Sequence, residues 1–523
     1  MNVISEIKSD RGIPTLYVDG QPFQAFAGEV HNSAAYDPET MEKEIWQKMD
    51  QSHLNTLIVP VYWETLEPEE GRYDFALVDA LLEQAARYEK KLILLWFGLW
   101  KNAESAYVPA WMKTDTETYF RVEMYGGERL NTISPLCMAA VEKDAAAFTR
   151  LMAHIRERDR NSTVIMTQVE NEVGLLGTER DYCPQAEKAF AEAVPDCLLA
   201  AAEQAGWICR EEMNAAEKPG WAEIFSEDAG EIFSAWCFGS ALEKIASAGR
   251  KEYPLPCYAN VWLKQFPWYA GSYPSGGPVE DMLWVWKAAA PSLCTIAPDI
   301  YVPYVADVME TYSRPDNPLL IPEVRKDAVT ASYAFYAFMN HHVLCYAPFG
   351  VEDLWQEEEV QLPAEVMDAL KLDPLSFDLS GTKETLGEVY RLLGEIQPLY
   401  LKYRGTPHLK CFLKKTAGEQ GCYLKFGSYD AEIQYFPQTA GAPASAGAVF
   451  ELDENRFLII GMMCSVKFYT KPGDHRKVDF LRKEAGTFRD GEWVCGQRQN
   501  GDEKIVTMMY NMPGCVKTEM FKY

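Results

Sequence analysis

Two glutamates separated by one asparagine follow an apolar stretch in QVENEVG, residues 168–174. An ionised carboxylate is costly to bury without a partner, so acids at the end of an apolar strand need an explanation. A further acid, Glu323, comes near the end of the apolar stretch PLLIPEV, residues 318–324. Two carboxyl groups about 5–5.5 Å apart can cleave a glycosidic bond together, one attacking as nucleophile and the other donating a proton. Either Glu170 or Glu172, together with Glu323, is therefore a candidate for such a pair.

Polar and aromatic side chains also follow the other apolar stretches, where they would line the same site. Aromatic rings pack on the C–H faces of a sugar, while a few polar groups bind its hydroxyls. The polar candidates are Glu29, Asn32, Asn102 and Tyr301, and the stacking candidates are Trp63, Trp100 and Phe349. Two acids with an aromatic rim form the pattern expected of a glycosidase, although the tryptophans could equally be core residues.

A purely structural role stays open for some of the acids. A glutamate at a strand end, such as Glu323, is often a solvated rim residue or a helix-cap partner. Strand alternation places Glu170 on the same face as Glu172. Only one of the two needs to be catalytic, so Glu170 could instead be a buried partner of Lys101 or Arg325.

Alternating helical and strand-like segments must position these side chains. The stretch TLYVDGQPF (15–23) predicts a hairpin with Asp19-Gly20 as its turn. Apolar residues at helical spacing predict helices at 39–52, 74–90 and 138–157. Strands are predicted at 23–30, 55–63, 91–98, 162–171, 254–263, 293–301, 318–324 and 343–350. Eight buried strands joined by helices fit a (β/α)₈ TIM barrel, an α/β fold in which the acids at the strand ends converge.

The residue pattern of the sequence changes near residue 405. Short alternating strands such as AEIQYFP, AVFEL and VKFYT then follow one another, separated by Gly, Pro, Asp and Asn. This pattern predicts an antiparallel β-sandwich. We therefore expect a catalytic barrel with an N-terminal hairpin at 1–376, a linking helix at 377–404 and the sandwich at 405–523.

Composition narrows the range of partners. The 523 residues carry a formal net charge of −27, which disfavours nucleic acid and anionic membranes as partners. The N-terminus lacks the pattern of a signal peptide and no apolar run is long enough to span a membrane, so we expect a cytoplasmic protein. The thirteen cysteines include no C-x-x-C pair and are expected to be thiols.

A family resemblance is carried by these same motifs. QVENEVG (168–174) resembles the strand-4 motif of glycoside hydrolase family 35 β-galactosidases, and its Asn-Glu pair resembles the acid/base position of clan A glycosidases. The resemblance implies that Glu172 is the acid/base and that Asn171 bonds the 2-hydroxyl of the sugar. LIPEVRKD (320–327) looks like the strand-7 segment that carries the nucleophile, which implies that role for Glu323.

The resemblance extends beyond the acids. TLEPEEGRYDF (65–75) is similar to a strand-2 stretch of families 35 and 42, and the segment 486–503 resembles the β-domain of a bacterial subgroup. Family 35 usually carries AEW on strand 3 and PWN-x-HEP on strand 2, whereas this chain reads LWFG and PVYWETLEP. A neighbouring clan A family such as 165 is therefore an alternative.

These observations predict a retaining, exo-acting β-galactosidase that hydrolyses terminal β-galactosides without a cofactor or metal. A β-glucosidase or β-mannosidase with the same machinery is the nearest alternative. A non-catalytic carbohydrate-binding barrel is a second, and a metal-dependent hydrolase is disfavoured because the seven histidines are dispersed. Clan relatives often complete a site with a neighbouring subunit, so a homo-oligomer is compatible with the resemblance.

Overall fold

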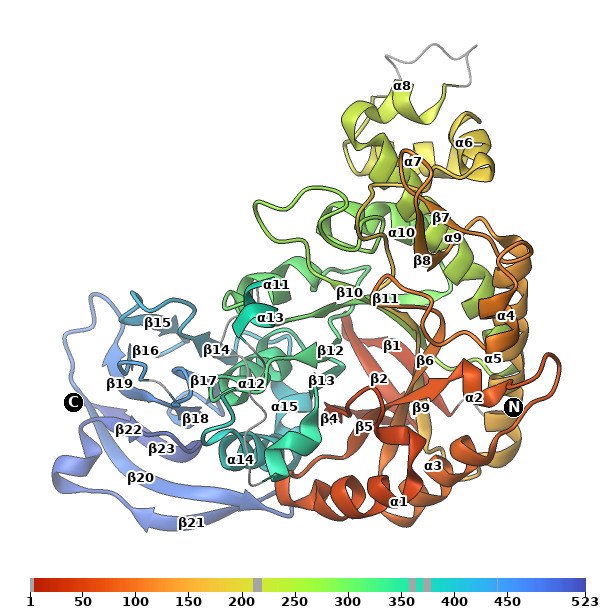
Figure 1. Ribbon diagram of the computed structural model, residues 1–523. Helices are drawn as coiled ribbons and strands as arrows, with labels where there is room; N and C mark the ends of the chain where they lie inside the picture. The colour runs from red at the N-terminus through yellow and green to blue at the C-terminus, as the bar shows by residue number, and fades with distance from the viewer. Residues whose placement is uncertain (1–3, 210–218, 357–363, 370–377, 440) are drawn as a thin grey trace.

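The computed structural model describes residues 4–209, 219–356, 364–369, 378–439 and 441–523. It shows a barrel of parallel strands surrounded by helices, followed by antiparallel β-sheets (Figure 1). The predicted fold class is therefore confirmed. No helix within these residues is long and apolar enough to cross a membrane.

A small antiparallel sheet opens the chain. Its strands are β1 (Ser5–Asp10), β2 (Ile13–Val18) and β3 (Gln21–Phe23). Val18 pairs with Gln21, so Asp19 and Gly20 form a two-residue turn, as predicted. Both turn residues have positive φ, 49° and 76°, which a type I′ hairpin requires and which Gly adopts at no steric cost.

Eight parallel strands form the barrel. They are β4 (Ala25–Glu29), β5 (Thr56–Tyr62), β6 (Lys91–Lys101), β9 (Val164–Asn171), β10 (Cys257–Trp262), β11 (Leu293–Asp299), β12 (Ile321–Val324) and β13 (Cys345–Pro348). Their spatial order is β11-β10-β9-β6-β5-β4-β13-β12. The two outer strands meet as well, because Ile300 N donates to Glu323 O at 2.9 Å and Arg325 N donates to Ile300 O at 3.0 Å. All eight predicted strands are present.

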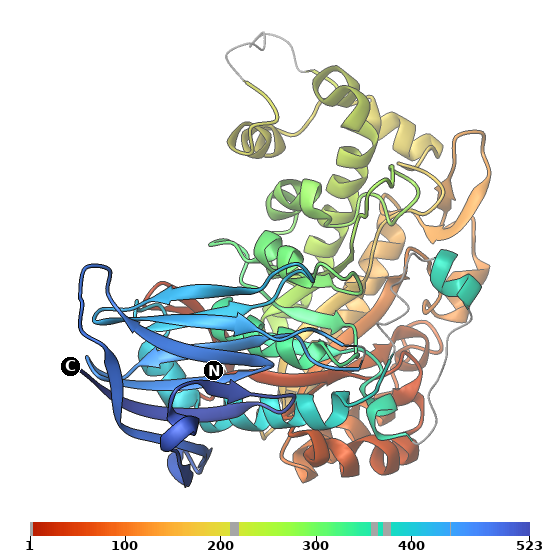
Figure 2. The ribbon, with the colours of Figure 1, turned by 90° about the vertical axis from the view of Figure 1, so that its left-hand side faces the viewer.

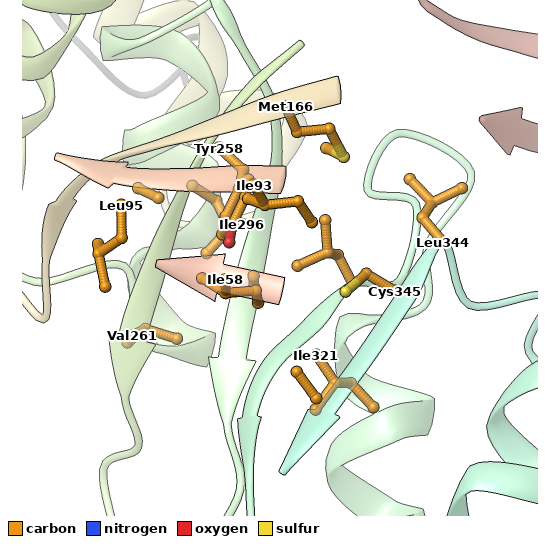
Figure 3. Packing of buried hydrophobic residues seen from close by; sticks show 14 of the residues in the cluster. Ile58, Ile93, Leu95, Met166, Tyr258, Val261, Ile296, Ile321, Leu344 and Cys345 are labelled. Atoms are coloured by element: carbon orange, nitrogen blue, oxygen red, sulfur yellow. The ribbon is translucent and has the colours of Figure 1, made fainter. Parts of the chain in front are cut away.

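Apolar side chains fill the inside of the barrel. Figure 3 shows Ile58, Ile93, Met166 and Ile296 gathered between the strands, and each is at most 2% exposed. Strands that are buried on the outside by helices and on the inside by such layers read as continuous apolar runs. This double burial explains why the strand signal in the sequence is so clear.

Helices cover the outside of the barrel. The longer ones are α3 (Ala76–Arg87), α5 (Met138–Arg158), α9 (Ala229–Glu252), α10 (Leu283–Ala289), α11 (Val305–Tyr312) and α12 (Thr330–Asn340). The helix predicted at 39–52 is instead three consecutive pieces, an α-turn α1 (Pro38–Thr40), a π-helical η2 (Met41–Ile45) and a 3₁₀ segment η3 (Trp46–Ser52). Further short helices are η1 (Ala34–Tyr36), α2 (Trp63–Leu66), η5 (Ser226–Asp228), η6 (Glu280–Met282), η7 (Val351–Trp355), α13 (Ala364–Ala369) and η9 (Gly501–Lys504).

The largest insertions follow the third and fourth barrel strands, as the sequence predicts. After β6 come α4 (Ala110–Thr114) and a hairpin of β7 (Arg121–Glu123) and β8 (Arg129–Ile133). After β9 come α6 (Pro184–Phe190), α7 (Asp196–Gln204) and α8 (Trp221–Phe225). Figure 1 shows these three helices grouped at the end of the molecule away from the sandwich.

Two antiparallel sheets form the C-terminal part. The six-stranded sheet contains, in spatial order, β14 (Leu409–Leu413), β17 (Ala446–Glu451), β18 (Arg456–Met462), β23 (Gly514–Lys522), β20 (Val478–Arg489) and β21 (Glu492–Arg498). The four-stranded sheet contains β15 (Gly421–Lys425), β16 (Tyr429–Tyr435), β19 (Cys464–Thr470) and β22 (Thr507–Met509). Figure 2 shows these strands layered beside the barrel.

Two helices occupy the segment predicted as a single link. They are α14 (Thr382–Glu395) and α15 (Gln397–Tyr403), with Pro398 in the first turn of the second, where a missing N–H does no harm. Residue 377, the predicted start of the link, lies outside the described residues. Tyr390 of α14 donates its hydroxyl to Ala27 O and Tyr346 O, at 3.1 and 2.9 Å, so α14 is bonded to two neighbouring barrel strands.

Candidate active site

The two predicted catalytic acids meet at the carboxyl ends of the barrel strands. Glu172 directly follows β9 and Glu323 lies on β12. One carboxylate oxygen from each lies within 4.8 Å of the other, and an oxygen of Asp299 at the end of β11 is equally close to both. The three residues are 3–6% exposed. The barrel thus brings together acids that are 151 positions apart in the sequence.

Glu323 accepts hydrogen bonds from three side chains. Its Oε1 accepts from Asn171 Nδ2 at 3.2 Å and from Asn260 Nδ2 at 3.4 Å, and its Oε2 accepts from the Tyr301 hydroxyl at 2.9 Å. Donors aimed at a carboxylate stabilise its negative charge. The three donors therefore hold the Glu323 carboxylate in a fixed orientation.

Glu172 lies in a different environment. Burial, followed by the negative charge of Glu323, raises the pKa of Glu172 from its ordinary 4.5 to about 7, although Lys101 and a hydrogen bond with Asp299 oppose the shift. Asn102 Nδ2 donates to Glu172 Oε2 at 2.6 Å. A carboxyl group with a pKa near neutrality can both give and take a proton at physiological pH. Glu172 is thus suited to exchange a proton, whereas Glu323 is held in place by three donors.

Lys101 supplies a positive charge beside the acids. Its Nζ donates to Asn171 Oδ1 at 2.7 Å, which fixes the amide so that Asn171 Nδ2 faces Glu323. The sequence suggested Lys101 or Arg325 as a partner of Glu170, and this prediction is wrong. The Arg325 guanidinium instead binds the Asp327 carboxylate.

Asn260 and Asp299 were not among the predicted site residues. Asn260 Nδ2 donates to Asp299 Oδ2 at 2.7 Å, and Asn260 Oδ1 accepts from Glu172 N at 2.9 Å. Burial and the charges of Glu323 and Glu172 raise the pKa of Asp299 well above its ordinary value, so its neutral form is favoured. The asparagine within the otherwise apolar strand CYANVW was the signal that could have identified this position.

Glu170 points away from the other two glutamates. Its Oε1 and Oε2 accept hydrogen bonds from Leu99 N at 3.1 Å and Trp100 N at 2.6 Å. The expectation that alternation puts Glu170 on the same face as Glu172 is therefore wrong. Both residues have positive φ, 61° and 45°, so the strand is no longer regular where it ends and its alternation is lost.

Two further predicted residues carry buried acceptors without a hydrogen-bond partner among the described residues. Both carboxylate oxygens of Glu29 and Oδ1 of Asn32 are in this state. Burial, followed by the charge of Glu323, raises the pKa of Glu29 well above its ordinary value. Buried polar groups are nearly always bonded, so groups such as these are suited to bind a ligand's hydroxyls or water.

The predicted aromatic rim is only partly present. Trp63 and Trp100 are completely buried, with their indole N–H groups bonded to Glu67 Oε2 at 2.8 Å and Ile133 O at 2.9 Å. They are core residues in this structure, and the prediction that they stack on a sugar is wrong. Phe349 is partly exposed and its ring lies 5.2 Å from that of His31. Of the three predicted stacking residues, Phe349 is the one whose ring is exposed enough to contact a sugar.

A network of charged side chains lies beside Phe349. His31 Nε2 lies 3.0 Å from both carboxylate oxygens of Asp353, which also binds Lys326. Although burial alone lowers the pKa of His31, the hydrogen bond to Asp353 and the negative charges of Glu352 and Asp353 raise it overall. The charged form of His31 is therefore stabilised relative to that of an exposed histidine. The sequence gives no sign of these contacts, because Asp353 lies 322 positions from His31.

The acid cluster is also the place where a cation would fit. Among the described residues, Glu172, Asp299 and Glu323 form the set of potential ligand atoms close enough to hold a metal ion. All of their ligand atoms are carboxylate oxygens, which Mg²⁺ and Ca²⁺ prefer, and no His or Cys belongs to the set. The site thus lacks the nitrogen or sulfur ligands typical of a catalytic zinc centre.

Two family models match separate parts of the chain. The model of glycosyl hydrolases family 35 matches residues 15–236, which contain Asn171 and Glu172. A model described as a domain of unknown function, DUF5597, matches residues 386–509. The chain therefore resembles family 35 over its N-terminal part, and the expectation of a glycoside hydrolase is supported there.

Two curated proteins are similar in sequence to part of this chain. A β-galactosidase from Xanthomonas manihotis is 26% identical over 186 residues, 35% of this chain and 29% of the relative. The β-galactosidase-1-like protein 3 of Homo sapiens is 25% identical over 199 residues, 34% of this chain and 26% of the relative. The chain thus spans less than a third of the length of these relatives.

Among solved structures, a β-galactosidase from Bacillus circulans sp. alkalophilus has a TM-score of 0.48 at 11% identity. That likeness covers 95% of this chain and 99% of the other.

Proposed function

We propose that this protein is a retaining β-glycosidase that removes terminal β-galactosyl units by double displacement. The observation that carries the proposal is the approach of Glu172 and Glu323 oxygens to within 4.8 Å of each other. Retaining enzymes need carboxyl groups about 5–5.5 Å apart, whereas inverting enzymes leave about 6.5–9.5 Å for a water molecule. The short separation favours retention.

In the first step, Glu323 attacks the anomeric carbon and the C–O bond to the leaving group breaks. The hydrogen bonds from Asn171, Asn260 and Tyr301 keep the attacking carboxylate oriented. Glu172, protonated below its pKa of about 7, gives its proton to the departing oxygen. The product is a glycosyl ester of Glu323 and a free alcohol.

In the second step, Glu172 is a carboxylate and takes a proton from water. The water oxygen attacks the anomeric carbon, the ester bond to Glu323 breaks, and the sugar leaves with its original anomeric configuration. Glu172 recovers its proton and Glu323 its charge, so the cycle closes. The same residue can serve as acid and base because, with a pKa of about 7, it can hold a proton in the first step and accept one in the second.

The sugar's hydroxyls would be bound by the polar groups around the acids. In the proposal, Asn171 bonds the 2-hydroxyl, and the unpartnered acceptors of Glu29 and Asn32 take other hydroxyl hydrogens. Phe349 offers a partly exposed ring for the C–H face of the sugar. The preference for galactose rests on the family 35 match and on the β-galactosidase relatives.

The first experiment follows hydrolysis of a nitrophenyl β-galactoside by proton NMR. Retention predicts that β-galactose appears first and that its α-anomer grows only through mutarotation. An α-anomeric first product would refute double displacement. A parallel panel of β-glucosides and β-mannosides distinguishes the preferred sugar from the alternatives with the same machinery.

Two further measurements separate the proposal from other classes of protein. Glu323→Ala should abolish turnover, and added azide should restore part of it as glycosyl azide, because the small anion replaces the missing nucleophile. A non-catalytic sugar-binding barrel would show no turnover to lose. Treatment with a chelator should leave kcat unchanged, whereas a metal-dependent hydrolase would lose activity.

A further inference from the structure

Strand β6 bulges where it passes Glu170. Trp96 pairs with Val169 and Lys101 pairs with Asn171, so four residues of β6 face the single residue Glu170 of β9. A bulge leaves backbone N–H groups without their normal ladder partners. Here the unpaired N–H groups need acceptors from elsewhere, since the strands are fully buried.

The missing acceptors are two side-chain carboxyl groups. Glu170 accepts from Leu99 N and Trp100 N, and Asp144 of α5 accepts from Leu99 N at 2.9 Å and from Trp96 Nε1 at 2.7 Å. Both carboxyl groups are completely buried and are hydrogen-bonded to each other. They replace the backbone acceptors that β9 cannot supply.

Gly98 leaves room for this arrangement. A Cβ at this position would lie 2.4 Å from Trp96 Nε1, 2.5 Å from Asp144 Oδ2 and 2.5 Å from Glu170 Oε1. Real Cβ atoms do not approach other atoms so closely, so no other residue fits without moving the pair. The glycine, the two acids and the indole therefore form one closely packed unit.

No positive charge balances the two acids. Neither Asp144 nor Glu170 forms an ion pair in the part of the chain that the structure describes. Two touching carboxylates without a cation repel each other strongly in a dry interior. One proton between them removes this repulsion and supplies their mutual hydrogen bond. Burial, followed by the charge of Asp144, raises the pKa of Glu170 well above its ordinary value, which agrees with a proton on that residue.

We propose that Asp144 and Glu170 share one proton and act as a positioning pair that fixes the β6 bulge, so that Lys101 and Asn102 reach the catalytic groups. This inference rests on the proposed function for its kinetic consequences but not for the shared proton itself. The pair touches neither the substrate nor the reacting atoms. It acts through the residues that follow the bulge.

The link from the bulge to the site is short. Lys101 and Asn102 are the first residues after the bulge, and they donate to Asn171 Oδ1 at 2.7 Å and to Glu172 Oε2 at 2.6 Å. The backbone N of Asn102 also donates to Asn171 O at 3.1 Å. A shift of the bulge therefore moves both donors away from the carboxyl and the amide that they hold.

The shared proton is tested by a double-mutant cycle on thermal stability. Glu170→Gln can give its NH₂ to Asp144 and its carbonyl to Trp100 N, while Leu99 N keeps Asp144 as acceptor. Asp144→Asn can keep its carbonyl on the Trp96 indole and give its NH₂ to an ionised Glu170, which retains the backbone donors. Each single change should therefore lower Tm by about 2 °C or less.

The double variant should behave differently. With two amides, the N–H groups of Leu99, Trp100 and the Trp96 indole share a closed space with two NH₂ groups, and only two carbonyls remain as acceptors. Tm should fall by more than the sum of the single changes, by about 5 °C or more. If both single variants fold and the double variant does not, this result also supports the shared proton. Additive losses, or a Glu170→Gln loss as large as that of Glu170→Ala, would overturn the shared proton.

The positioning role is tested by kinetics on a β-glycoside. Glu170→Ala should lower kcat by about tenfold to a hundredfold with little change in KM, because small displacements of catalytic groups are costly. The alkaline limb of its kcat–pH profile should move to higher pH, since Glu172 loses the Asn102 donor that favours its charged form. Glu170→Gln should restore the profile. If Glu170→Ala folds poorly, Asp144→Ala provides the second route to the same pair.

The outcomes separate the two proposals. A Glu170→Ala protein that is less stable but keeps the wild-type kcat and pH profile overturns the positioning role. A wild-type protein without glycosidase activity overturns the proposed function, and the stability cycle still decides on the shared proton. Glu117→Gln is the matched control, because this exposed glutamate lies far from the bulge in the sequence and should change neither measurement.

Discussion

Asn102 donates a hydrogen bond of 2.6 Å to Glu172, although 70 positions separate the two residues in the chain. The bond joins the end of β6 to the end of β9 and fixes the carboxyl that is proposed to handle the proton. An amide donor favours a charged acceptor, so we expect the same bond to oppose the rise in the pKa of Glu172 that burial causes. One contact is therefore expected to affect both the orientation and the proton affinity of this carboxyl.

Removal of that contact gives the first prediction. Asn102→Ala should raise the pKa of Glu172 above its value of about 7 and move the alkaline limb of the kcat profile to higher pH. The carboxyl is also less well oriented, so kcat should fall by about tenfold. The measurement is kcat against pH on a nitrophenyl β-galactoside. Asn131→Ala, at an exposed asparagine, should leave the limb in place.

The buried acids predict a dependence of stability on pH. Between pH 4.5 and about 7, Glu172 keeps in the folded state a proton that the unfolded chain has lost, so raising the pH through this window favours unfolding. Glu170, Asp299 and Glu29 have raised pKa values and act in the same direction. Tm should therefore fall as the pH rises from about 5 to about 8.

Glu172→Gln isolates one contribution to this trend. Its amide does not titrate, so the slope of Tm against pH should be shallower than in the wild type. The exposed Glu117→Gln should reproduce the wild-type slope. A slope that steepens in Glu172→Gln would contradict a raised pKa for this acid.

The Tyr301 hydroxyl supports the proposed nucleophile. Tyr301→Phe removes the 2.9 Å hydrogen bond to Glu323 Oε2, and a hydrogen bond to a charged group is worth about 1.5–3 kcal/mol. We expect kcat/KM to fall by about tenfold to a hundredfold, measured by steady-state kinetics. Tyr304→Phe, at a ring that is 44% exposed, should have little effect. Equal losses in both variants would argue against a specific role for Tyr301.

The aromatic residues separate into two kinds. Phe349→Ala should raise KM for a galactoside several-fold while leaving Tm nearly unchanged, because its partly exposed ring is free to contact a sugar. Trp100→Ala should instead cost about 3–5 kcal/mol of stability, since its ring is completely buried. Thermal melting and KM measured on both variants check this division. A raised KM with unchanged stability in Trp100→Ala would reverse it.

The sequence predicted the parts of the fold that periodicity and burial determine. Strand β9 is visible because it is buried on both faces, and the Asp19-Gly20 turn is visible because few dipeptides adopt its backbone conformation. The helix predicted at 39–52 is divided into α, π and 3₁₀ pieces, which differ in hydrogen-bond register but keep nearly the same apolar stripe. A stripe of apolar residues cannot reveal that register.

The sequence could predict only those site residues that lie at the converging ends of the barrel strands. Glu172 and Glu323 could be paired because a barrel directs its strand ends to one place. Glu170 was misassigned because alternation fails where φ becomes positive, and the sequence does not show where that occurs. The tryptophans were misassigned for a related reason, since an indole at a strand end can turn toward the outer helices as well as toward the opening.

Helix α14 has a consequence for the independence of the two parts of the chain. Its Tyr390 hydroxyl bridges Ala27 and Tyr346 of the barrel, while Arg391 donates to Phe488 O at 3.1 Å in the sandwich. A truncated protein ending before this helix would expose the apolar surface around Phe26, whose ring lies 5.4 Å from that of Tyr390. We therefore expect the barrel and the sandwich to melt together in one cooperative transition.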